Sequence, residues 1–485
     1  MVKRKQSKAL PGKRFCKQCE QMIPIHSRVC QFCNAPQYTI QQIAKEYKKR
    51  LKAITDDDDV LDKYKNLFTK DNPFITELKD QTMYFEDLPK EIAVGNEIEV
   101  LVNGTSKHIG YLEAEKIDKI SVINAGGDTV SLAWAFRSDD AQYLAISTLP
   151  YGEKLYYGHV YQGYGIIQIW KIAESPSFSY GIVHYGKAAL DMKWLPAYNT
   201  ASDIIGTLAV ALANGEIHIY NPIIVDSQTK ALNIAPIETF SIPELVFSCI
   251  VWIDPVNSLA AGTQDGSIFI FRSCSSKPVL SIFSAHKLPI SSINWCNSSS
   301  CIASCSLDGL LKLWDKEGKV LDEICSSKRW SYHLCSNPLG TYLFFDNDGA
   351  ISPHKVVKLE GRKIKNKKYV NLSSEATLST CFSPVSSYAY IASVDGFIAG
   401  IFLSELEKSF KKRKSPWSRH CKIVSQSIGD VITIESSKHQ SSLEKTPKKS
   451  LCDFASAITH IELTLRGNSD IIAWGGRICG IMELN

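Results

Sequence analysis

Asx-Gly dipeptides recur at near-regular intervals along the chain, and this period constrains the fold more than any other feature. They stand 40 to 51 residues apart, at Asn214-Gly215, Asp265-Gly266, Asp308-Gly309, Asp348-Gly349 and Asp395-Gly396. Each lies between short runs rich in β-branched and aromatic residues, where Asx-Gly is typical of a two-residue hairpin turn. A repeat of this length with several strands predicts the blades of a β-propeller.

The clearest copy of the repeat is SAHKLPISSINWCNSSSCIASCSLDGLLKLWD, residues 284–315. It resembles a WD repeat, with Ala-His in place of Gly-His. The resemblance implies that His286, a strand serine, Asp308 and Trp314 form a buried hydrogen-bond network. The same residue types could form a catalytic triad, but we interpret them as a fold signature because such positions recur from repeat to repeat.

Seven units of this kind can be counted in the sequence. The last unit has three strands, and we expect residues 118–124, DKISVIN, to supply its fourth strand and close the ring. The predicted fold is therefore all-β, a seven-bladed WD-repeat propeller over residues 116–485. Two insertions interrupt the regular spacing, one at residues 361–369 and a longer one at about residues 404–452.

The N-terminal segment, residues 1–37, carries two CxxC pairs with the spacing Cys16-x2-Cys19-x10-Cys30-x2-Cys33. Four thiolates at tetrahedral corners suit a structural zinc ion, and with them the shell is closed even though His26 lies nearby. A redox centre would need a thioredoxin-like context, which this segment lacks. The odd total of 15 cysteines without framework spacing argues against disulfides and for a reducing compartment. We therefore expect a zinc ribbon with one structural Zn2+ and a basic arm.

Positive charge is concentrated in the N-terminal region and in the longer insertion. Residues 1–52 contain 13 Lys or Arg and only two Glu. Residues 38–115 are predicted to form a basic amphipathic helix at about residues 40–54, followed by a linker. A basic stretch with an aromatic residue fits a nucleic-acid contact. The candidate DNA-contacting residues are Lys48, Lys49, Arg50, Lys411, Lys412, Arg413, Lys414, Trp417 and Arg419.

Three other interpretations of these basic segments are open. The helix could pack on the main domain with a solvated basic face. The insertion could be a solvated loop, and either segment could serve as a nuclear import signal.

Several function classes lack their signatures in this sequence. No apolar run reaches the ~18 residues that a membrane span needs. The P-loop, HExxH and GxSxG motifs are absent from the sequence. We therefore expect a chain that is not an enzyme, with no small-molecule substrate and no membrane partner.

The early blades carry a more specific pattern. GGDTVSLAWAF, YLAISTLP, GYGIIQIWKI, YGIVHYGKAALDMKWLP and LAVALANGEIHIYNP follow one another in this order. This series resembles the WD-repeat subunit of general transcription factor IIIC, and the resemblance is best over residues 126–222. It implies a nuclear protein that holds other subunits of the factor together and helps it bind the B-box of tRNA-type genes. The zinc ribbon is not part of that match.

Three hypotheses for function follow from these observations. The first is a non-enzymatic scaffold and DNA-binding subunit in RNA polymerase III transcription. The second is a chromatin or ubiquitin-ligase adaptor whose propeller binds a peptide. The third, an enzyme or RNA-processing factor, is weakest because no catalytic constellation is found.

Overall fold

The computed structural model describes residues 96–325, except for 136–141, 152, 157, 197–202, 226–230, 255–257 and 274–277. It also describes three short strands and residue 92 before this range, and the strands of the later sheets after it. The chain divides into two compact units, Met1–Thr55 and Asp56–Asn485.

The first unit contributes one described element, a small antiparallel hairpin. Strand β1 (Lys13–Phe15) pairs with β2 (Met22–Pro24), and Phe15 lies opposite Met22. Cys16, Cys19, Cys30 and Cys33 lie outside the described residues, as does the predicted helix at 40–54. The zinc ribbon and the basic helix therefore stay predictions.

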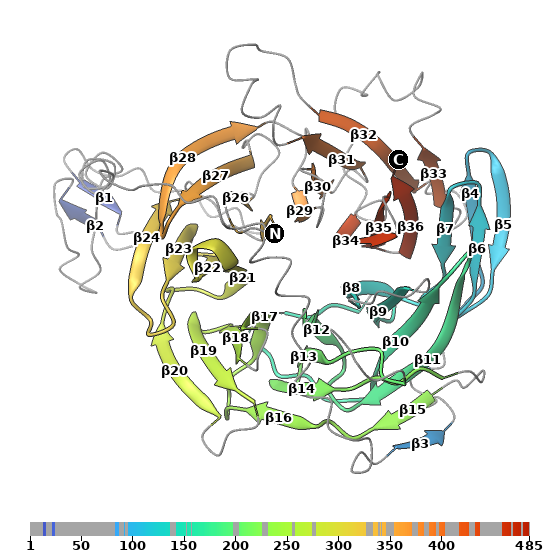
Figure 1. Ribbon diagram of the computed structural model, residues 1–485, viewed down its shortest axis with the longest axis horizontal. Helices are drawn as coiled ribbons and strands as arrows, with labels where there is room; N and C mark the ends of the chain where they lie inside the picture. Colours follow the sequence, from blue (N-terminus) through green and yellow to red (C-terminus); the bar gives the residue numbers. More distant parts are fainter. Residues whose placement is uncertain are drawn as a thin grey trace. The chain divides into compact units, whose positions relative to one another are not determined.

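In the second unit, the described inner strands contact one another in cyclic order and so close a ring (Figure 1). Each begins one sheet of at least four strands. The inner strands are β8 (Asp128–Trp134), β12 (Ala189–Trp194), β17 (Phe247–Asp254), β21 (Ile290–Cys296), β25 (Leu334–Ser336), β29 (Thr377–Phe382) and β34 (Ile458–Arg466). We call the sheets blades one to seven in this order.

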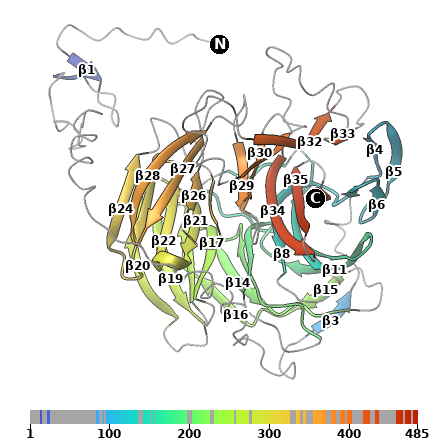
Figure 2. The same cartoon turned by 45° about the horizontal axis from the view of Figure 1, so that its top comes forward.

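Each blade continues outward as an antiparallel meander, and Figure 2 shows the sheets in a tilted view. The outer strands of blades one to three are β9 (Gln142–Leu149), β10 (Gly165–Ile172), β11 (Pro176–His184), β13 (Leu208–Leu212), β14 (Glu216–Tyr220), β16 (Glu238–Ser241), β18 (Ser258–Thr263), β19 (Ser267–Arg272) and β20 (Val279–Ser284). Those of blades four to six are β22 (Cys301–Ser306), β23 (Leu310–Trp314), β24 (Val320–Cys325), β26 (Tyr342–Phe345), β27 (His354–Glu360), β28 (Lys363–Val370), β30 (Tyr388–Ser393), β31 (Phe397–Phe402) and β32 (Trp417–Ser425).

Blade seven is completed by a strand from the other end of the propeller. Strands β35 (Ser469–Gly476) and β36 (Cys479–Leu484) follow β34, and β36 then pairs antiparallel with β7 (Ile120–Ile123). The prediction that residues 118–124 supply the fourth strand is therefore confirmed. This pairing joins the first and last parts of the ring, and it covers a sheet edge of β36 that would otherwise be exposed.

Six described strands lie outside the four-stranded meanders and extend blades one, six and seven. β3 (Met83–Glu86) and β15 (Ala231–Ile234) extend blade one, and β6 (Ala114–Ile117) extends blade seven. β4 (Ile98–Val102) and β5 (Thr105–Ile109) join blade six through β33 (Ile432–Ser436). The predicted linker before residue 116 thus holds four strands, which sequence periodicity did not reveal because each run is only four or five residues long.

Parts of two basic stretches predicted as insertions lie on strands. Most of residues 361–369 belongs to β28, the outermost strand of blade five, in which Ile364 is buried. Residues 417–422 of the longer insertion belong to β32 of blade six. Lysines are common on edge strands because their charge discourages pairing with other chains, so a basic run does not by itself indicate a loop.

The Asx-Gly turns also differ from the prediction. β13–β14, β18–β19 and β22–β23 are joined by three residues rather than two, and the glycine is the third. Its φ is positive in each case, at Gly215 (92°), Gly266 (93°) and Gly309 (78°). Three-residue hairpin loops that end in a left-handed residue are the next most common class after the predicted two-residue turns. Gly349 and Gly396 lie outside the described residues.

Hydrogen bonds from inner strands tie each of the first four blades to the next. They are Ser131 Oγ to Ala189 O (2.9 Å), Ile250 N to Asp191 Oδ2 (2.9 Å), Ser248 Oγ to Ile290 O (2.5 Å) and Ser292 Oγ to Leu334 O (3.2 Å). The indoles of Trp194 and Trp252 each donate 3.0 Å bonds to the preceding blade, at Ala133 O and Lys193 O. These bonds satisfy polar groups near the ring centre and fix the rotation of one blade against the next.

The described residues are almost entirely strands and their connections, with one short 3-10 helix at Asn297–Ser299. The all-β propeller prediction is confirmed, while the blade count for the whole chain stays a prediction. Among the described residues, no helix is both long and apolar enough to cross a membrane.

Candidate functional site

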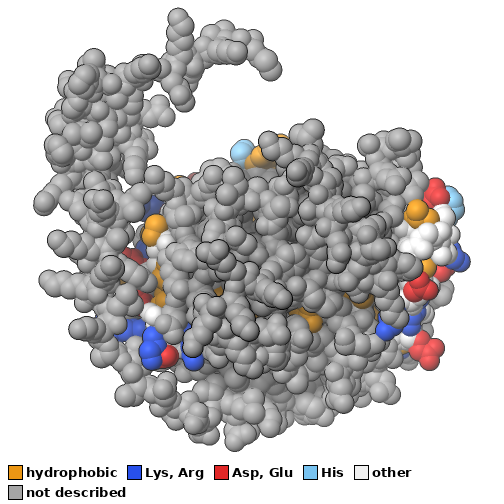
Figure 3. Space-filling model, turned by 90° about the horizontal axis from the view of Figure 1, so that it is seen from above, with side chains coloured by type: hydrophobic (Ala, Val, Ile, Leu, Met, Phe, Trp, Pro, Cys, Tyr) orange, Lys and Arg blue, Asp and Glu red, His pale blue; other side chains and the backbone are white. Residues whose placement is uncertain are grey.

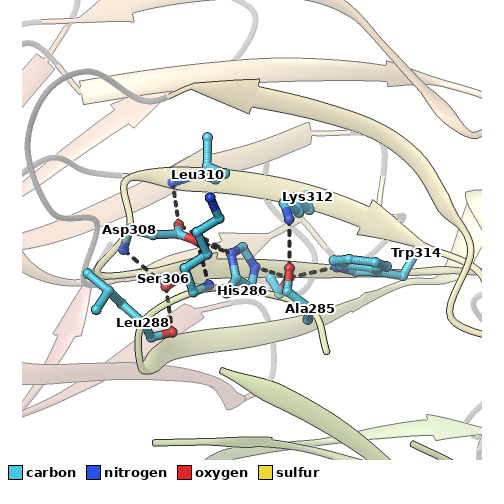
Figure 4. Close-up of polar contacts among 10 residues, drawn as sticks. Ala285, His286, Leu288, Ser306, Asp308, Leu310, Lys312 and Trp314 are labelled. Atoms are coloured by element: carbon cyan, nitrogen blue, oxygen red, sulfur yellow. Dashed lines mark hydrogen bonds and ion pairs between the residues drawn. The ribbon is translucent and has the colours of Figure 1, made fainter. Parts of the chain in front are cut away.

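The residues that most resemble a catalytic centre lie at the start of blade four (Figure 4). His286 precedes β21, Ser304 lies on β22, Asp308 is in the β22–β23 turn and Trp314 ends β23. His286 Nδ1 is 3.1 Å from Asp308 Oδ2 and His286 Nε2 is 2.8 Å from Ser304 Oγ. The Trp314 indole nitrogen is 2.8 Å from the same serine oxygen. The structure thus joins all the residues named for this network.

The proton positions follow from the partners. The Trp314 N–H can only donate, so the Ser304 oxygen accepts from it. Ser304 then donates its own proton to His286 Nε2, and His286 donates Nδ1–H to the Asp308 carboxylate. A neutral imidazole therefore satisfies every hydrogen bond in the series from Trp314 through Ser304 and His286 to Asp308.

The electrostatics favour the same protonation state. Burial lowers the pKa of His286, although the Asp308 carboxylate opposes this shift. Burial also opposes ionisation of Asp308, but hydrogen bonds from His286, Lys287 N–H and Leu310 N–H together hold the pKa of this carboxyl below its ordinary value. The pair is therefore a neutral histidine beside a carboxylate.

The arrangement leaves no room for a substrate. The side chains of His286 and Asp308 are 0% and 9% exposed, and Ser304 is fully buried. The Ser304 hydroxyl already donates its proton to the imidazole and accepts from the Trp314 N–H, so it is not available to attack a substrate. We conclude that the network is structural.

What the network fixes is the connection between blades three and four. Asp308 accepts from Lys287 N at 3.1 Å and from Leu310 N at 2.9 Å. Ser306 Oγ donates to Leu288 O at 2.9 Å, and Lys312 Nζ donates to Ala285 O at 2.6 Å. These bonds hold the segment from Ala285 to Leu288 against the β22–β23 hairpin.

Blades two and three keep only part of this pattern. Asn214 and Asp265 accept from the backbone N–H two residues on, at 3.1 and 3.0 Å, as Asp308 does. The position of Trp314 is taken by Tyr220 and Phe271. Neither side chain has an indole N–H, so the donor that begins the chain in blade four is missing there.

The predicted DNA-contacting residues are only partly described. Lys48, Lys49, Arg50 and Lys411, Lys412, Arg413 and Lys414 lie outside the described residues. Trp417 and Arg419 lie on β32, where the backbone pairs them with Ile401 and Ala399 of β31. The structure therefore places these two on a strand of blade six and not on the predicted basic loop.

The described surface does not form a basic patch beside β4 and β5. Charged side chains of both signs gather along one edge of Figure 3, where these strands lie in Figure 1. Glu99, Lys107 and His108 are among the residues of the two strands. Mixed charge of this kind offers little attraction to a polyanion.

The cysteines and metal ligands can be judged only in part. The eight cysteines whose side chains the structure describes form no disulfide bond, and most are buried. Within the same residues no group of three or more His, Cys, Asp or Glu is placed to hold a metal ion. The four predicted zinc ligands are not among those residues.

A feature that sequence analysis missed is the tyrosine-rich connection between β9 and β10. It reaches over blades two and three, since Tyr161 N donates to Ala213 O at 2.9 Å and Gly158 N donates to the side-chain oxygen of Gln264. Tyr151 and Tyr156 are exposed on it. The signal was in the sequence, where five tyrosines fall within residues 151–164.

His184, at the end of β11, provides a test of acid stability. It is buried, and neither ring nitrogen has a hydrogen-bond partner within the described residues. Burial, with a smaller contribution from His218, lowers its pKa from the ordinary 6.5 to about 3. Between these values the unfolded chain binds a proton that the folded chain does not, so stability falls as pH falls.

At pH 5 this single group is expected to cost about 2 kcal/mol of the free energy of unfolding relative to neutral pH. In His184→Gln, the free energy of unfolding obtained from urea denaturation should fall by about 2 kcal/mol less between pH 7 and pH 5 than it does in the wild type. His108→Gln, which alters an exposed histidine, should leave the slope unchanged. Equal slopes for the wild type and His184→Gln would contradict the assignment.

Comparison with known proteins identifies the repeat. Residues 277–315 match the family model described as "WD domain, G-beta repeat". The chain is also similar to "Restriction of telomere capping protein 1" of Candida dubliniensis, with 27% identity over 205 residues, or 40% of this chain and 17% of that protein. The chain thus spans less than a fifth of the length of this relative.

Among solved structures, a chain of "Crystal Structure of Mitotic Checkpoint Complex" is similar with 12% identity and a TM-score of 0.46. The match covers 73% of this chain and 88% of that chain. The matched WD repeat contains the His286 network described above. The WD repeat predicted at residues 284–315 is confirmed.

Proposed function

We propose that this WD-repeat protein is a non-enzymatic scaffold subunit of RNA polymerase III transcription factor IIIC. In this role the propeller binds other subunits, while the basic segments and the zinc ribbon bind DNA at tRNA-type promoters. The observation that carries the scaffold role is that Ser304 and His286 are buried and the Asp308 side chain is nearly so. The most enzyme-like group of the described residues thus serves the fold, and the surface remains as the functional part.

The assignment to this factor is supported by the ordered series of motifs over residues 126–222. That series spans blades one and two and includes surface residues as well as core strands. Tyr164 and Tyr185 lie within it and are about half exposed. A fold alone does not require exposed tyrosines, so their place in the series favours a shared partner. The relative named for telomere capping also favours a nuclear location.

Affinity purification tests the proposal directly. The tagged chain, expressed in its own cells, should bring down other subunits of transcription factor IIIC, identified by mass spectrometry. A purification that yields chromatin proteins or ubiquitin-ligase subunits instead would support the alternative adaptor role. Failure to recover any subunit of the factor would overturn the proposal.

DNA binding through the basic insertion should be electrostatic and largely independent of sequence. The slope of log K against log salt concentration is negative, and its magnitude decreases by about 0.9 for each phosphate that the protein no longer neutralises. Replacing Lys411, Lys412, Arg413 and Lys414 by alanine should lower the magnitude of the slope measured with a B-box duplex. Replacing Lys154 and Lys319, two lysines of the propeller, serves as the control. Identical slopes for both variants would argue against this contact.

The zinc ribbon has its own test. Purified protein should contain one zinc ion per chain, and Cys16→Ser should abolish tight binding because a structural site needs all four ligands. Metal content is measured by inductively coupled plasma mass spectrometry. Cys325→Ser, which alters an exposed cysteine of β24, should leave the zinc content unchanged. A wild-type chain without zinc would refute the prediction.

A further inference from the structure

A cavity of about 300 Å3 opens beside the ends of β10 and β11. Its walls come from segments distant in sequence, including the β9–β10 connection, the β11–β12 connection and the segment that precedes β6. Its lining includes three tyrosines and a proline, Tyr111, Tyr164, Tyr185 and Pro150, beside two isoleucines, three glycines, Thr148 and Lys187. The volume is at the lower end of the range for ligand sites, which suits a short segment of chain rather than a large cofactor.

The aromatic walls are held in place by the fold. The rings of Tyr164 and Tyr185 meet edge to face, with centroids 5.4 Å apart and planes at 82°. Lys187 N donates to Gly163 O at 2.9 Å, which joins the two connections that carry these rings. A Cβ at Gly165 would lie 2.4 Å from Lys187 O, so only glycine permits this close approach. The surface is therefore formed before any partner binds, which lowers the entropic cost of binding.

The chemistry of the cavity is aromatic and close to neutral. Among its described lining residues the cation is Lys187, and its ammonium lies 2.8 Å from the Glu153 carboxylate. A phosphate or an acidic side chain would have to compete with that carboxylate. Tyr164 and Tyr185 are nevertheless 47% and 55% exposed, a large apolar area for a protein surface to leave in water.

Neutral, aromatic-lined grooves suit proline-containing segments in the polyproline II conformation. Such segments are already extended, so they lose little entropy on binding, and their proline rings pack flat on aromatic faces. Their backbone makes no internal hydrogen bonds, which leaves carbonyl groups to accept from tyrosine hydroxyls. We propose that this cavity binds a proline-containing, uncharged, extended segment of a partner protein. As a docking point for a partner subunit, it rests on the scaffold role proposed above.

Fluorescence anisotropy with the full-length protein tests the site. The probe is a labelled decaproline peptide, and we expect saturable binding that weakens at least tenfold in Tyr164→Ala/Tyr185→Ala. Tyr164→Phe/Tyr185→Phe, which keeps the rings, should retain most of the affinity and guards against misfolding of the alanine variant. Tyr156→Ala is the matched control, because Tyr156 is 62% exposed on the same connection and does not line the cavity.

Labelled oligoglutamate and single-stranded DNA are tested in parallel. Tighter binding of either than of decaproline, no saturable decaproline binding, or an equal loss in Tyr156→Ala would overturn the inference. The proposed function fails separately. If the wild type binds decaproline through these tyrosines but recovers no subunit of transcription factor IIIC, the cavity assignment stands and the complex assignment falls.

Discussion

Asp308→Ala is expected to lower the free energy of unfolding of the propeller by about 2–4 kcal/mol. The substitution removes the acceptor for the His286 Nδ1–H and for the backbone N–H groups of Lys287 and Leu310. The His286 side chain is fully buried, so its donor is left without a partner and without water. The measurement is urea unfolding followed by tryptophan fluorescence.

Asp265→Ala provides the matched control for this prediction. Asp265 occupies the same position in the β18–β19 turn and accepts from the Ser267 N–H and from the hydroxyls of Thr263 and Ser267, but it is exposed and its partners do not include a histidine. Its loss should cost about 1 kcal/mol, the ordinary value of a solvated hydrogen bond. If both variants lose the same stability, the buried network contributes nothing beyond the turn.

Gly266→Ala should destabilise the protein by about 3 kcal/mol or more. Gly266 has a φ of +93°, which costs an L-residue about 1–2 kcal/mol. An added Cβ would also lie 2.4 Å from His286 O and 3.0 Å from Leu288 O, both backbone atoms that cannot move alone. The same contact would displace the segment that carries His286.

Gly104→Ala separates the cost of the positive φ from the cost of the Cβ clash. Gly104 follows Asn103 in the two-residue turn between β4 and β5, and its φ of +89° is nearly the same. An added Cβ would meet no atom within 4 Å, so only the backbone cost of about 1 kcal/mol is expected. Thermal denaturation of the two variants should rank Gly266→Ala well below Gly104→Ala, and a reversed order would exclude the clash.

Local signals predicted the propeller well. The Asx-Gly period and the WD copy located the central blades, and the missing strand of the last unit pointed to residues 118–124. These succeeded because a blade is a meander whose strands pair with their sequence neighbours. The network of His286, Ser304, Asp308 and Trp314 was visible for the same reason, since all four lie within one repeat.

Features that depend on distant pairing were not predicted. β4 lies beside β33, more than 300 residues away in sequence, and a four- or five-residue run gives no local sign of such a partner. The run of Lys and Arg without an acidic residue made the β28 segment look like an insertion, although Ile364 packs inward. The tyrosines around the cavity come from separate segments, so only the folded chain brings them together.

One overlooked signal could have been read from the sequence. A Ser or Asp stands three or four residues before a tryptophan on the inner strands of blades one to four, at Ser131, Asp191, Ser248 and Ser292. The structure shows that each of these side chains bonds to the next blade. A polar residue repeated at one place in an apolar strand is therefore a usable sign of inter-blade bonding.

The pairing of β7 with β36 also has a consequence for biosynthesis. Ile123 leaves the ribosome about 350 residues before its partner Cys479. At roughly 5–20 residues per second, the nascent chain waits on the order of 20–70 s with both the β7 edge and the first inner strands uncovered. Until then the nascent chain carries an unpaired sheet edge of the kind that invites aggregation, and the ring closes only after the β36 segment has been made.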